Sequence, residues 1–558
     1  MSATLDEPRI RIRQQSAESY ARGSTAVPLL DETIGENLRR TVARFPGREA
    51  LVVRGQSYRA TYDELWEQVG LAARGLLARG VERGDRVGIW APNRYEWFVT
   101  QFAAARVGAI MVNVNPAYKT TELEHALNKV GVKLLIHSRG FRQTDYTAMI
   151  DDVRDRCPAL EETLVLEDDW DALLDSGARI DELMLAEREA ELHPDDPINI
   201  QFTSGTTGLP KGATLSHRNL LNNGFFCGET LRYSEHDRIC VPVPFYHCFG
   251  CVVGNLAATT HGACVVVPGE AFDAHATLET VAEERCTSLY GVPTMFIAEL
   301  DEPRFAEFDL SSLRTGAMAG APCPVKVMKR VRSDMNMDEV TIACGMTETS
   351  PVSTQTAVDD PIEKCVSTIG RAHPHVEVKI VDPESGAVVP RGTPGEQCTR
   401  GYSVMLGYWG DSEATSRAVD EDGWMHTGDL STMDDEGYVN IVGRIKDMII
   451  RGGENIYPRE VEEFLLTIDG VSDAYVIGVP SDYYGEEVMA WLKLRDGAAL
   501  TSDELHTACH GRIATYKIPR YWKFVDAFPM TVTGKVQKFV MRELAIEELN
   551  MGGTPAGP

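Results

Sequence analysis

Short apolar runs rich in β-branched residues alternate with helix-length amphipathic stretches from about residue 33 to residue 345. Two of these runs are ALVV (50–53) and RVGIWAP (86–92), and the amphipathic stretch 62–80 lies between them. Alternation of strands and helices is typical of parallel sheets that are covered by helices. The sequence therefore predicts a layered α/β architecture, with ligand-binding loops at the carboxyl ends of the strands.

The pattern changes twice along the rest of the chain. Between about 370 and 442, short β-like pieces are broken by Gly and Pro, which predicts a β-rich subdomain. From about 446 onward, helical and strand patterns indicate a separate α+β unit. A chain of 558 residues is also too long for a single compact domain. We therefore expect a large N-terminal domain over 1–445 and a small C-terminal domain over 446–558.

The chain carries 83 acidic and 55 basic residues, a formal net charge of −28. This acidic balance argues against nucleic acid or an anionic membrane as the main partner. The 12 cysteines are scattered, the N-terminal residues lack the apolar stretch of a secretory signal, and no run of about 18 apolar residues occurs. We therefore expect a cytoplasmic protein without an integral membrane segment, in which any anion site is built locally.

The segment TSGTTGLPKG (203–212) directly follows the apolar run INIQF. Glycines let the backbone approach a ligand closely, and hydroxyls, amides and an ammonium group are the donors that a polyphosphate needs. The segment is not a Walker A loop, because Pro210 stands where that motif requires glycine. It predicts a phosphate-binding loop, against the alternative of a solvated surface turn.

An ordered set of segments resembles the motifs of the AMP-forming acyl-CoA synthetases, within the adenylate-forming enzymes. The resemblance covers nearly the whole chain and implies two half-reactions. A carboxylic acid first attacks the α-phosphorus of ATP, which gives acyl-AMP and pyrophosphate, and the CoA thiol then displaces AMP. The segments are TSGTTGLPKG (203–212), PFYH (244–247), AGAP (319–322), GMTE (345–348), HTGD (426–429), GRIKD (443–447), RGGENIYPREVE (451–462) and PMTVTGK (529–535).

The resemblance implies a role for individual side chains in binding ATP and Mg²⁺. Lys535 is expected at the α-phosphate and the acyl carboxylate, and Glu348 is expected to be the Mg²⁺ ligand. Asp429 and Arg444 are expected to contact the ribose. The residues expected to be catalytic are Lys535, Thr206, His247 and Glu348. The residues expected to bind ATP are Thr203, Ser204, Gly205, Thr206, Thr207, Gly208, Leu209, Pro210, Lys211, Gly320, Ala321, Pro322, Cys344, Gly345, Met346, Thr347, Asp429, Arg444 and Lys535.

The adenine part of the predicted site departs from the family pattern. The AGAP stretch is similar to the segment that forms the wall for adenine. Family members usually have Tyr or another aromatic residue before the Gly of GMTE, whereas this chain has Cys344. Loss of a stacking ring is expected to weaken nucleotide binding by about 1–3 kcal/mol, by analogy with base stacking on other proteins.

The resemblance also implies positions for the acid and for CoA. His247 and Phe249 are expected near the carboxylate and at the mouth of the acyl pocket. Gly452 and Gly453 are expected to line the channel for the CoA arm, where a side chain would block close approach. Lys446 is expected to be the hinge about which the small domain rotates between the two half-reactions.

The acid and the acyl acceptor stay open at this level. The apolar stretch around Phe249 favours a fatty acid of medium or greater length, and an aryl acid is the alternative. Loading of a separate carrier protein is the alternative to transfer to free CoA. A nucleotide-binding regulatory protein without turnover is a third interpretation, motivated by Cys344. The sequence makes no prediction about the oligomeric state.

Overall fold

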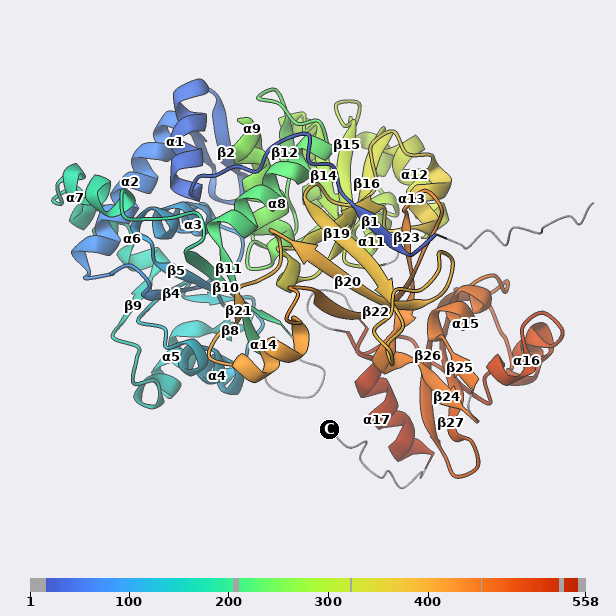
Figure 1. The fold of residues 1–558 in the computed structure, drawn as a ribbon. Helices are drawn as coiled ribbons and strands as arrows, with labels where there is room; N and C mark the ends of the chain where they lie inside the picture. The colour runs from blue at the N-terminus through green and yellow to red at the C-terminus, as the bar shows by residue number, and fades with distance from the viewer. Residues whose placement is uncertain (1–16, 204–209, 322–323, 453, 531–535, 550–558) are drawn as a thin grey trace, which may run out of the picture.

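The computed structural model describes residues 17–203, 210–321, 324–452, 454–530 and 536–549. Figure 1 shows a large α/β body, which the N-terminal part of the chain forms, and a smaller α+β body at the C-terminal end. The predicted fold class is confirmed. Among the described residues, no helix combines the length and the apolar character needed to cross a bilayer.

The first sheet has seven strands in the order β21-β11-β10-β5-β4-β6-β9. In this order, the strands from β10 to β9 run parallel to one another. Strand β11 pairs antiparallel with β10, and β21 pairs antiparallel with β11. Side chains alternate between the two faces of β4, because Val87 and Ile89 enter one apolar core and Trp90 enters another. The strands are β4 (Arg86–Trp90), β5 (Ile110–Asn113), β6 (Leu134–His137), β9 (Glu162–Val165), β10 (Pro197–Thr203), β11 (Lys211–Ser216) and β21 (Gly407–Tyr408).

Helices cover both faces of this sheet. Residues of α2, α3 and α6 belong to the larger core on one face, and residues of α4 and α5 belong to the core on the other face. Thr61 caps the amino end of α2, where its side chain accepts from the amide of Glu64. The helices are α2 (Tyr62–Ala78), α3 (Tyr95–Val107), α4 (Thr120–Val130), α5 (Tyr146–Val153), α6 (Leu166–Gly177) and α7 (Glu182–Glu189).

The second sheet has nine strands in the order β18-β17-β16-β15-β14-β12-β13-β2-β3. Its six central strands run parallel, from β16 to β2. The strands are β2 (Glu49–Val53), β3 (Tyr58–Thr61), β12 (Arg238–Cys240), β13 (Cys264–Val267), β14 (Ser288–Gly291), β15 (Thr315–Ala319), β16 (Glu339–Gly345), β17 (Val352–Gln355) and β18 (Arg371–Ala372).

A layer of helices lies between the two sheets and shares one core with both. The inner layer contains α1 (Ile34–Arg44), α8 (His217–Thr230) and α9 (Ala257–His261), together with α2 and α3. The outer face of the second sheet packs against α10 (Ala274–Glu284), α11 (Pro293–Leu300), α12 (Val325–Asp334) and α13 (Ile362–Ser367). Each of the two large sheets is therefore covered by helices on both faces.

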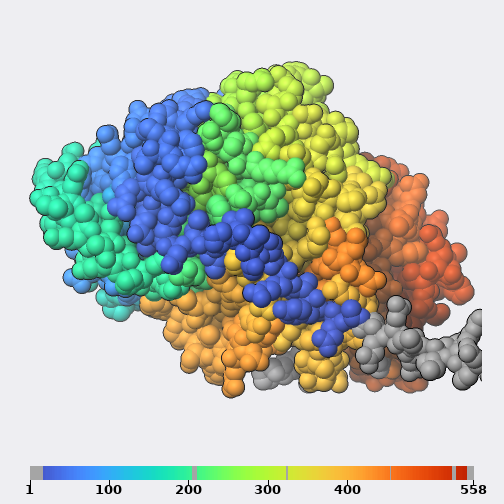
Figure 2. All heavy atoms as spheres, turned by 45° about the horizontal axis from the view of Figure 1, so that its top comes forward, coloured from blue at the N-terminus to red at the C-terminus, as the bar shows by residue number. Residues whose placement is uncertain are grey.

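The third sheet is antiparallel, with five strands in the order β1-β19-β20-β22-β23. Its first strand comes from the N-terminal segment, which Figure 2 shows running over the surface of the large body. The strands are β1 (Tyr20–Arg22), β19 (Val376–Val381), β20 (Gly395–Gly401), β22 (Met425–Met433) and β23 (Val439–Arg444), and helix α14 (Ser412–Ala418) lies between β20 and β22 in the chain.

The first strand of the C-terminal sheet is β24. Four residues separate it from the end of β23, and three of them form the 3-10 helix Ile445–Asp447. One face packs against α15 and α16, and the other packs against α17. Helix α15 contacts β23 of the large body. The elements are β24 (Ile449–Arg451), β25 (Glu454–Ile456), α15 (Pro458–Leu465), β26 (Val471–Ser481), β27 (Gly485–Leu494), α16 (Ser502–Cys509), β28 (Tyr521–Phe524) and α17 (Lys538–Glu548).

Candidate functional site

Three segments that are far apart in the sequence meet at the antiparallel edge of the first sheet. Lys211, near the end of the predicted phosphate-loop segment, begins β11. Tyr408 lies on β21, the neighbouring strand. Glu348 lies in the 3-10 helix Thr347–Thr349, which follows β16 of the second sheet. The Tyr408 hydroxyl donates to Glu348 Oε1 at 2.8 Å, and Lys211 Nζ lies 5.0 Å from the centroid of the Tyr408 ring. The two sheets therefore contribute a carboxylate, a phenol and an ammonium group to one place.

The Glu348 carboxylate is nearly enclosed by protein. The residue is 5% exposed, and a buried carboxylate is stabilised only when donors or cations face it. Burial, followed by the negative charge of Glu348, raises the pKa of Tyr408 far above its ordinary value. The phenol therefore stays protonated and keeps donating to the carboxylate.

A tight turn fixes the position of Glu348. A Cβ on Gly345 would lie 1.8 Å from the carbonyl oxygen of Pro351, so only glycine fits there. The Thr349 hydroxyl lies 3.0 Å from that same oxygen and accepts from the Met346 amide at 3.2 Å. The backbone oxygen of Glu348 accepts from the Met405 amide at 2.9 Å. The predicted GMTE motif is therefore held on both sides of the glutamate.

His247 lies beside this turn. The backbone amide of Phe249 donates to His247 Nδ1 at 3.1 Å, so in the neutral ring Nε2 carries the proton. Cys248 Sγ lies 3.9 Å from Thr347 Oγ1, which places the PFYH motif next to the GMTE motif. The imidazole is half-buried at this junction.

Phe249 begins a π-helix that spans Phe249–Leu256. Its ring is 6% exposed and stacks on Tyr290, with ring centroids 5.6 Å apart and planes at 19°. The Tyr290 hydroxyl belongs to a buried hydrogen-bond network, in which it accepts from the Tyr233 hydroxyl at 2.8 Å. An apolar aromatic surface thus follows directly after His247.

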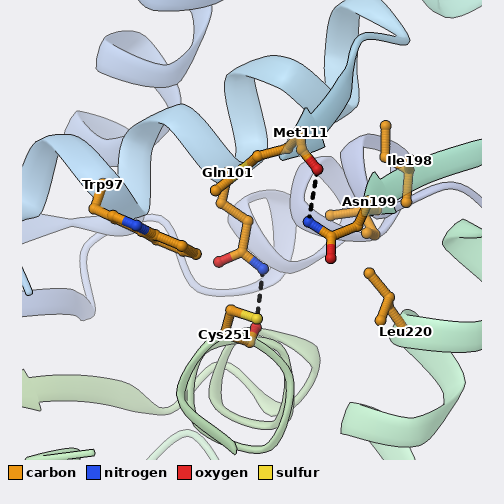
Figure 3. Close-up of a pocket in the computed structure, with 8 residues that line it drawn as sticks. Trp97, Gln101, Met111, Ile198, Asn199, Leu220 and Cys251 are labelled. Atoms are coloured by element: carbon orange, nitrogen blue, oxygen red, sulfur yellow. Dashed lines mark hydrogen bonds between the residues drawn. The ribbon is translucent and has the colours of Figure 1, made fainter. Parts of the chain in front are cut away.

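The side chain of Gln101, on α3, bonds to the π-helix, as Figure 3 shows. Gln101 Nε2 donates to the carbonyl of Cys251 at 2.9 Å, and Asn255 Nδ2 donates to Gln101 Oε1 at 2.9 Å. π-Helical turns are rare and often occur at functional sites, because their irregular hydrogen bonding leaves backbone groups that need other partners. The adjoining cavity, lined partly by Trp97 and Asn199, measures only about 10 Å³, so it is far too small for an acyl chain. The hydrogen bonds of Gln101 to Cys251 and Asn255 therefore position the π-helix that carries Phe249.

Asp429 and Arg444 form a cross-strand pair between β22 and β23. Arg444 Nε donates to Asp429 Oδ1 at 3.0 Å, and the two side chains are 51% and 23% exposed, respectively. The Asp429 amide donates to the Thr427 hydroxyl at 3.1 Å, which orders the HTGD turn. The two residues predicted to contact the ribose therefore lie side by side and reach solvent.

The predicted adenine segments leave the second sheet at neighbouring positions. Strands β15 and β16 run parallel, with Ala319 opposite Ala343, so Gly320 directly follows β15 and Cys344 is the next-to-last residue of the neighbouring strand β16. Gly320 has φ +86°, a conformation that favours glycine. Cys344 is half-buried. The carboxyl ends of parallel strands carry these segments, as predicted.

Other predicted residues fall at the borders of the described chain or beyond them. Thr203 and Lys211 pair across β10 and β11, and the Pro210 carbonyl lies 3.0 Å from Nε2 of His125. The Gly452 amide donates to the Tyr484 carbonyl at 2.8 Å. The predicted site residues outside the described part are Ser204, Gly205, Thr206, Thr207, Gly208, Leu209, Pro322, Gly453 and Lys535.

Lys446 occupies the 3-10 helix between the third sheet and the C-terminal sheet. Partial burial removes water from the ammonium group and thereby lowers the pKa of Lys446, although part of its side chain is exposed. The nearby Arg444 lowers the pKa further, whereas Asp447 and Asp429 oppose the shift. The residue predicted to be the hinge therefore lies between the predicted ribose pair and the start of β24.

Tyr408 is a residue of this site that the sequence analysis missed. It lies 60 residues after Glu348, on a strand of two residues, so no periodic pattern marks it. Gln101 was missed for a similar reason, because its partner Cys251 is 150 residues away.

Replacement of Tyr408 by Phe is expected to weaken acyl-AMP formation. A hydrogen bond to a charged group contributes about 1.5–3 kcal/mol, so ATP–pyrophosphate exchange should fall about 10- to 100-fold. The matched control is Tyr438→Phe, because the Tyr438 hydroxyl donates to the carboxylate of Asp360 at 2.5 Å within a different part of the fold. Equal exchange rates in the two variants would contradict a role for Tyr408 in holding Glu348.

Comparisons with known proteins identify the family of the chain. The AMP-binding enzyme family matches residues 38–409, and the C-terminal domain of AMP-binding enzymes matches residues 460–535. YngI of Bacillus subtilis (strain 168) is 45% identical over 546 residues, which cover 94% of this chain and 99% of that protein. The mitochondrial medium-chain acyl-CoA ligase ACSF2 of Danio rerio is 43% identical over 557 residues, 96% of this chain and 91% of that protein.

Solved structures match the fold along almost the whole chain. ATP-bound MatB from Rhodopseudomonas palustris has a TM-score of 0.82 at 29% identity, with 93% of this chain and 100% of that chain covered. Because the curated relative ACSF2 is named as a CoA ligase, the alternatives of carrier-protein loading and of regulation without turnover are not favoured. ATP, CoA and a carboxylic acid are the substrates of such ligases. The chain belongs to the AMP-forming acyl-CoA synthetases of the adenylate-forming enzyme superfamily.

Proposed function

We propose that this ATP-dependent acid–CoA ligase activates a fatty acid of medium or greater chain length at the junction of its two large sheets. The observation that carries the proposal is the buried carboxylate of Glu348, which Tyr408 holds beside Lys211. A carboxylate and an ammonium group at the end of a phosphate-binding hairpin suit a crowded anionic substrate better than an apolar one.

The roles of the residues follow from their positions. Lys211 and the loop that precedes it bind the β- and γ-phosphates of ATP, and Thr347 adds a hydroxyl contact. Asp429 accepts hydrogen bonds from the ribose hydroxyls, with Arg444 beside it. The segments that begin at Gly320 and Cys344 enclose adenine. His247 faces the acyl carboxylate, with Nδ1 accepting from the Phe249 amide, so that the neutral ring carries its proton on Nε2.

Mg²⁺ fits the donor set around Glu348. This ion prefers one or two carboxylates together with phosphate oxygens, and Glu348 offers one carboxylate next to the predicted phosphate loop. When bound, the metal neutralises phosphate charge. Tyr408 orients the carboxylate through Oε1, and the turn at Gly345 holds its backbone.

The small domain over 446–558 supplies a different residue for each half-reaction. Lys535 serves acyl-AMP formation, and Gly452 and Gly453 line the path of the CoA arm. Only four residues separate β23 of the third sheet from β24 of the C-terminal sheet, which supports Lys446 as the hinge between them. Gly453 and Lys535 lie outside the described residues, so their roles rest on the motifs RGGENIYPREVE and PMTVTGK.

A cytoplasmic location accompanies this proposal. In the described part of the chain, nine cysteines other than Cys248 and Cys344 are free thiols, and all nine are buried. Free thiols in this number suit a reducing compartment.

The apolar surface of Phe249 and Tyr290 supports an aliphatic acyl chain, and the name of the relative ACSF2 points to medium length. Each methylene buried in an apolar pocket contributes about 0.8 kcal/mol, so kcat/KM should rise about fourfold per added methylene until the pocket is full. The measurement is octanoyl-CoA formation compared with a series from butyrate to palmitate and with benzoate. We expect a maximum near octanoate, at least about tenfold above benzoate.

Phe249→Ala tests whether this ring lines the acyl pocket. Removal of the ring should move the optimum toward longer or bulkier acids while ATP KM stays unchanged. A benzoate optimum in the wild-type enzyme, or an unchanged chain-length profile in Phe249→Ala, would overturn the aliphatic assignment.

A further inference from the structure

Three metal-ligating side chains gather on one face of the third sheet, away from Glu348. Glu396 and Cys398 are two residues apart on β20, so they face the same side, and His426 lies opposite Cys398 on β22. His426 Nδ1 is 2.8 Å from Glu396 Oε2 and 3.5 Å from Cys398 Sγ. One ligand atom from each residue lies within 4.8 Å of the other two.

These separations resemble those of a tetrahedral metal site. Zinc bonds of about 2.0–2.3 Å at tetrahedral angles place neighbouring ligand atoms about 3.3–3.7 Å apart. The distance between Nδ1 and Sγ already falls in this range, and the carboxylate oxygen needs to move outward by only about half an ångström. The set of one thiol, one imidazole and one carboxylate suits a borderline-soft divalent ion rather than Mg²⁺.

The surroundings of the cluster also resemble a built metal site. Asp420 Oδ2 lies 3.6 Å from His426 Nε2, the ring nitrogen that faces away from the cluster. A carboxylate that approaches by a few tenths of an ångström more accepts the Nε2 proton and orients a ligating imidazole. The Cys398 side chain is buried, whereas the His426 side chain is 33% exposed, so an ion reaches the cluster from solvent past the imidazole.

We propose that Glu396, Cys398 and His426 bind a borderline-soft divalent cation, best matched by Zn²⁺, at a site separate from the one proposed for Mg²⁺. The ion takes the place of the thiol proton of Cys398, which passes to solvent. Nδ1 likewise gives up to solvent the proton that it shares with Glu396 Oε2, and the imidazole binds the ion as a neutral ring whose one proton lies on Nε2, toward Asp420.

Occupation of this site is coupled to the ribose pair. Glu396 Oε1 accepts from the Gly428 amide at 3.1 Å, and the Thr427 hydroxyl donates to the Gln397 carbonyl at 2.7 Å. Outward movement of the carboxylate by about half an ångström weakens this 3.1 Å contact in the turn that carries Asp429. Binding of Zn²⁺ therefore raises the KM for ATP, a consequence that rests on the proposed role of Asp429.

A Co²⁺ titration of the full chain tests the site without relying on activity. Co²⁺ bound to a thiolate gives a charge-transfer absorption that Co²⁺ on carboxylates does not give. We expect this band in the wild type and in Cys365→Ser, a control at another buried cysteine, and we expect Zn²⁺ to displace it. In Cys398→Ser the band should disappear. In His426→Gln the affinity for Co²⁺ should fall by more than ~10- to 100-fold, the loss expected when the altered residue only contacts a metal ligand and does not bind the metal itself.

Absence of the band in the wild type, or an equal band in Cys398→Ser, would overturn the site and leave the proposed ligase chemistry untouched. His426→Gln keeps the test valid if Cys398→Ser does not fold. The coupling is measured as the KM for ATP with excess Mg²⁺, with and without Zn²⁺. We expect Zn²⁺ to raise it in the wild type and in Cys365→Ser but not in Cys398→Ser, and an equal rise in Cys398→Ser would refute the coupling.

Discussion

Replacement of Glu348 by Gln is expected to lower ATP–pyrophosphate exchange by about 100- to 1000-fold, the loss typical when one preorganised electrostatic group is removed from an active site. The substitution keeps the size of the side chain and its contact with Tyr408 but removes the charge. A neutral amide oxygen is a poor ligand for Mg²⁺, and its NH₂ group places a donor where a cation is expected. The effect should therefore appear in the acyl-AMP step.

Glu339→Gln is the matched control for this prediction. Glu339 begins β16, the strand that precedes the turn carrying Glu348, and it pairs with Arg314 at 2.8 Å. This variant should keep wild-type exchange within about twofold, because distant sites act independently. Thermal unfolding of both variants separates a loss of chemistry from a loss of folding. A Glu348→Gln enzyme that exchanges pyrophosphate as fast as Glu339→Gln would contradict the assignment.

Lys535→Ala is expected to separate the two half-reactions. Loss of this ammonium group should reduce acyl-AMP formation by at least about 100-fold, because negative charge on the α-phosphate then lacks a cation. Thioester formation from supplied acyl-AMP and CoA should change less than about threefold, since the group acts only in the first transition state. The measurement follows each half-reaction separately by rapid quench.

Gly453→Leu is the converse variant. A bulky side chain at this position should spare exchange and block thioester formation from supplied acyl-AMP. Equal loss of both half-reactions in Lys535→Ala, or undiminished CoA turnover in Gly453→Leu, would refute the division of roles between the two segments.

The layered α/β fold could be predicted because its signals are local. Each parallel strand is a short apolar run, such as β4 and β13, and the strands alternate with amphipathic helices. The segments that carry Lys211, Glu348 and Asp429 were also predicted, from the order of their motifs. Glu348 follows the carboxyl end of the parallel strand β16, in agreement with the rule for parallel sheets, whereas Lys211 begins the antiparallel strand β11 and Asp429 lies within the antiparallel strand β22.

Contacts between distant segments could not be predicted in the same way. Strand β1 pairs with β19 more than 350 residues later, and β21 adds two residues to the edge of the first sheet. Neither strand is long enough to show a period of two. Tyr408 and Gln101 depend on such contacts, and so does the cluster of Glu396, Cys398 and His426, whose members form no contiguous motif.

The central claim is that residues from separate segments of the chain surround one ATP molecule. A crystal structure of the full chain with Mg²⁺ and a non-hydrolysable ATP analogue tests it most directly. The account predicts the metal between Glu348 and the phosphates, Lys211 beside the same phosphates, and both ribose hydroxyls within hydrogen-bonding distance of Asp429. Phosphates bound away from Glu348, or a ribose without contact to Asp429, would contradict it.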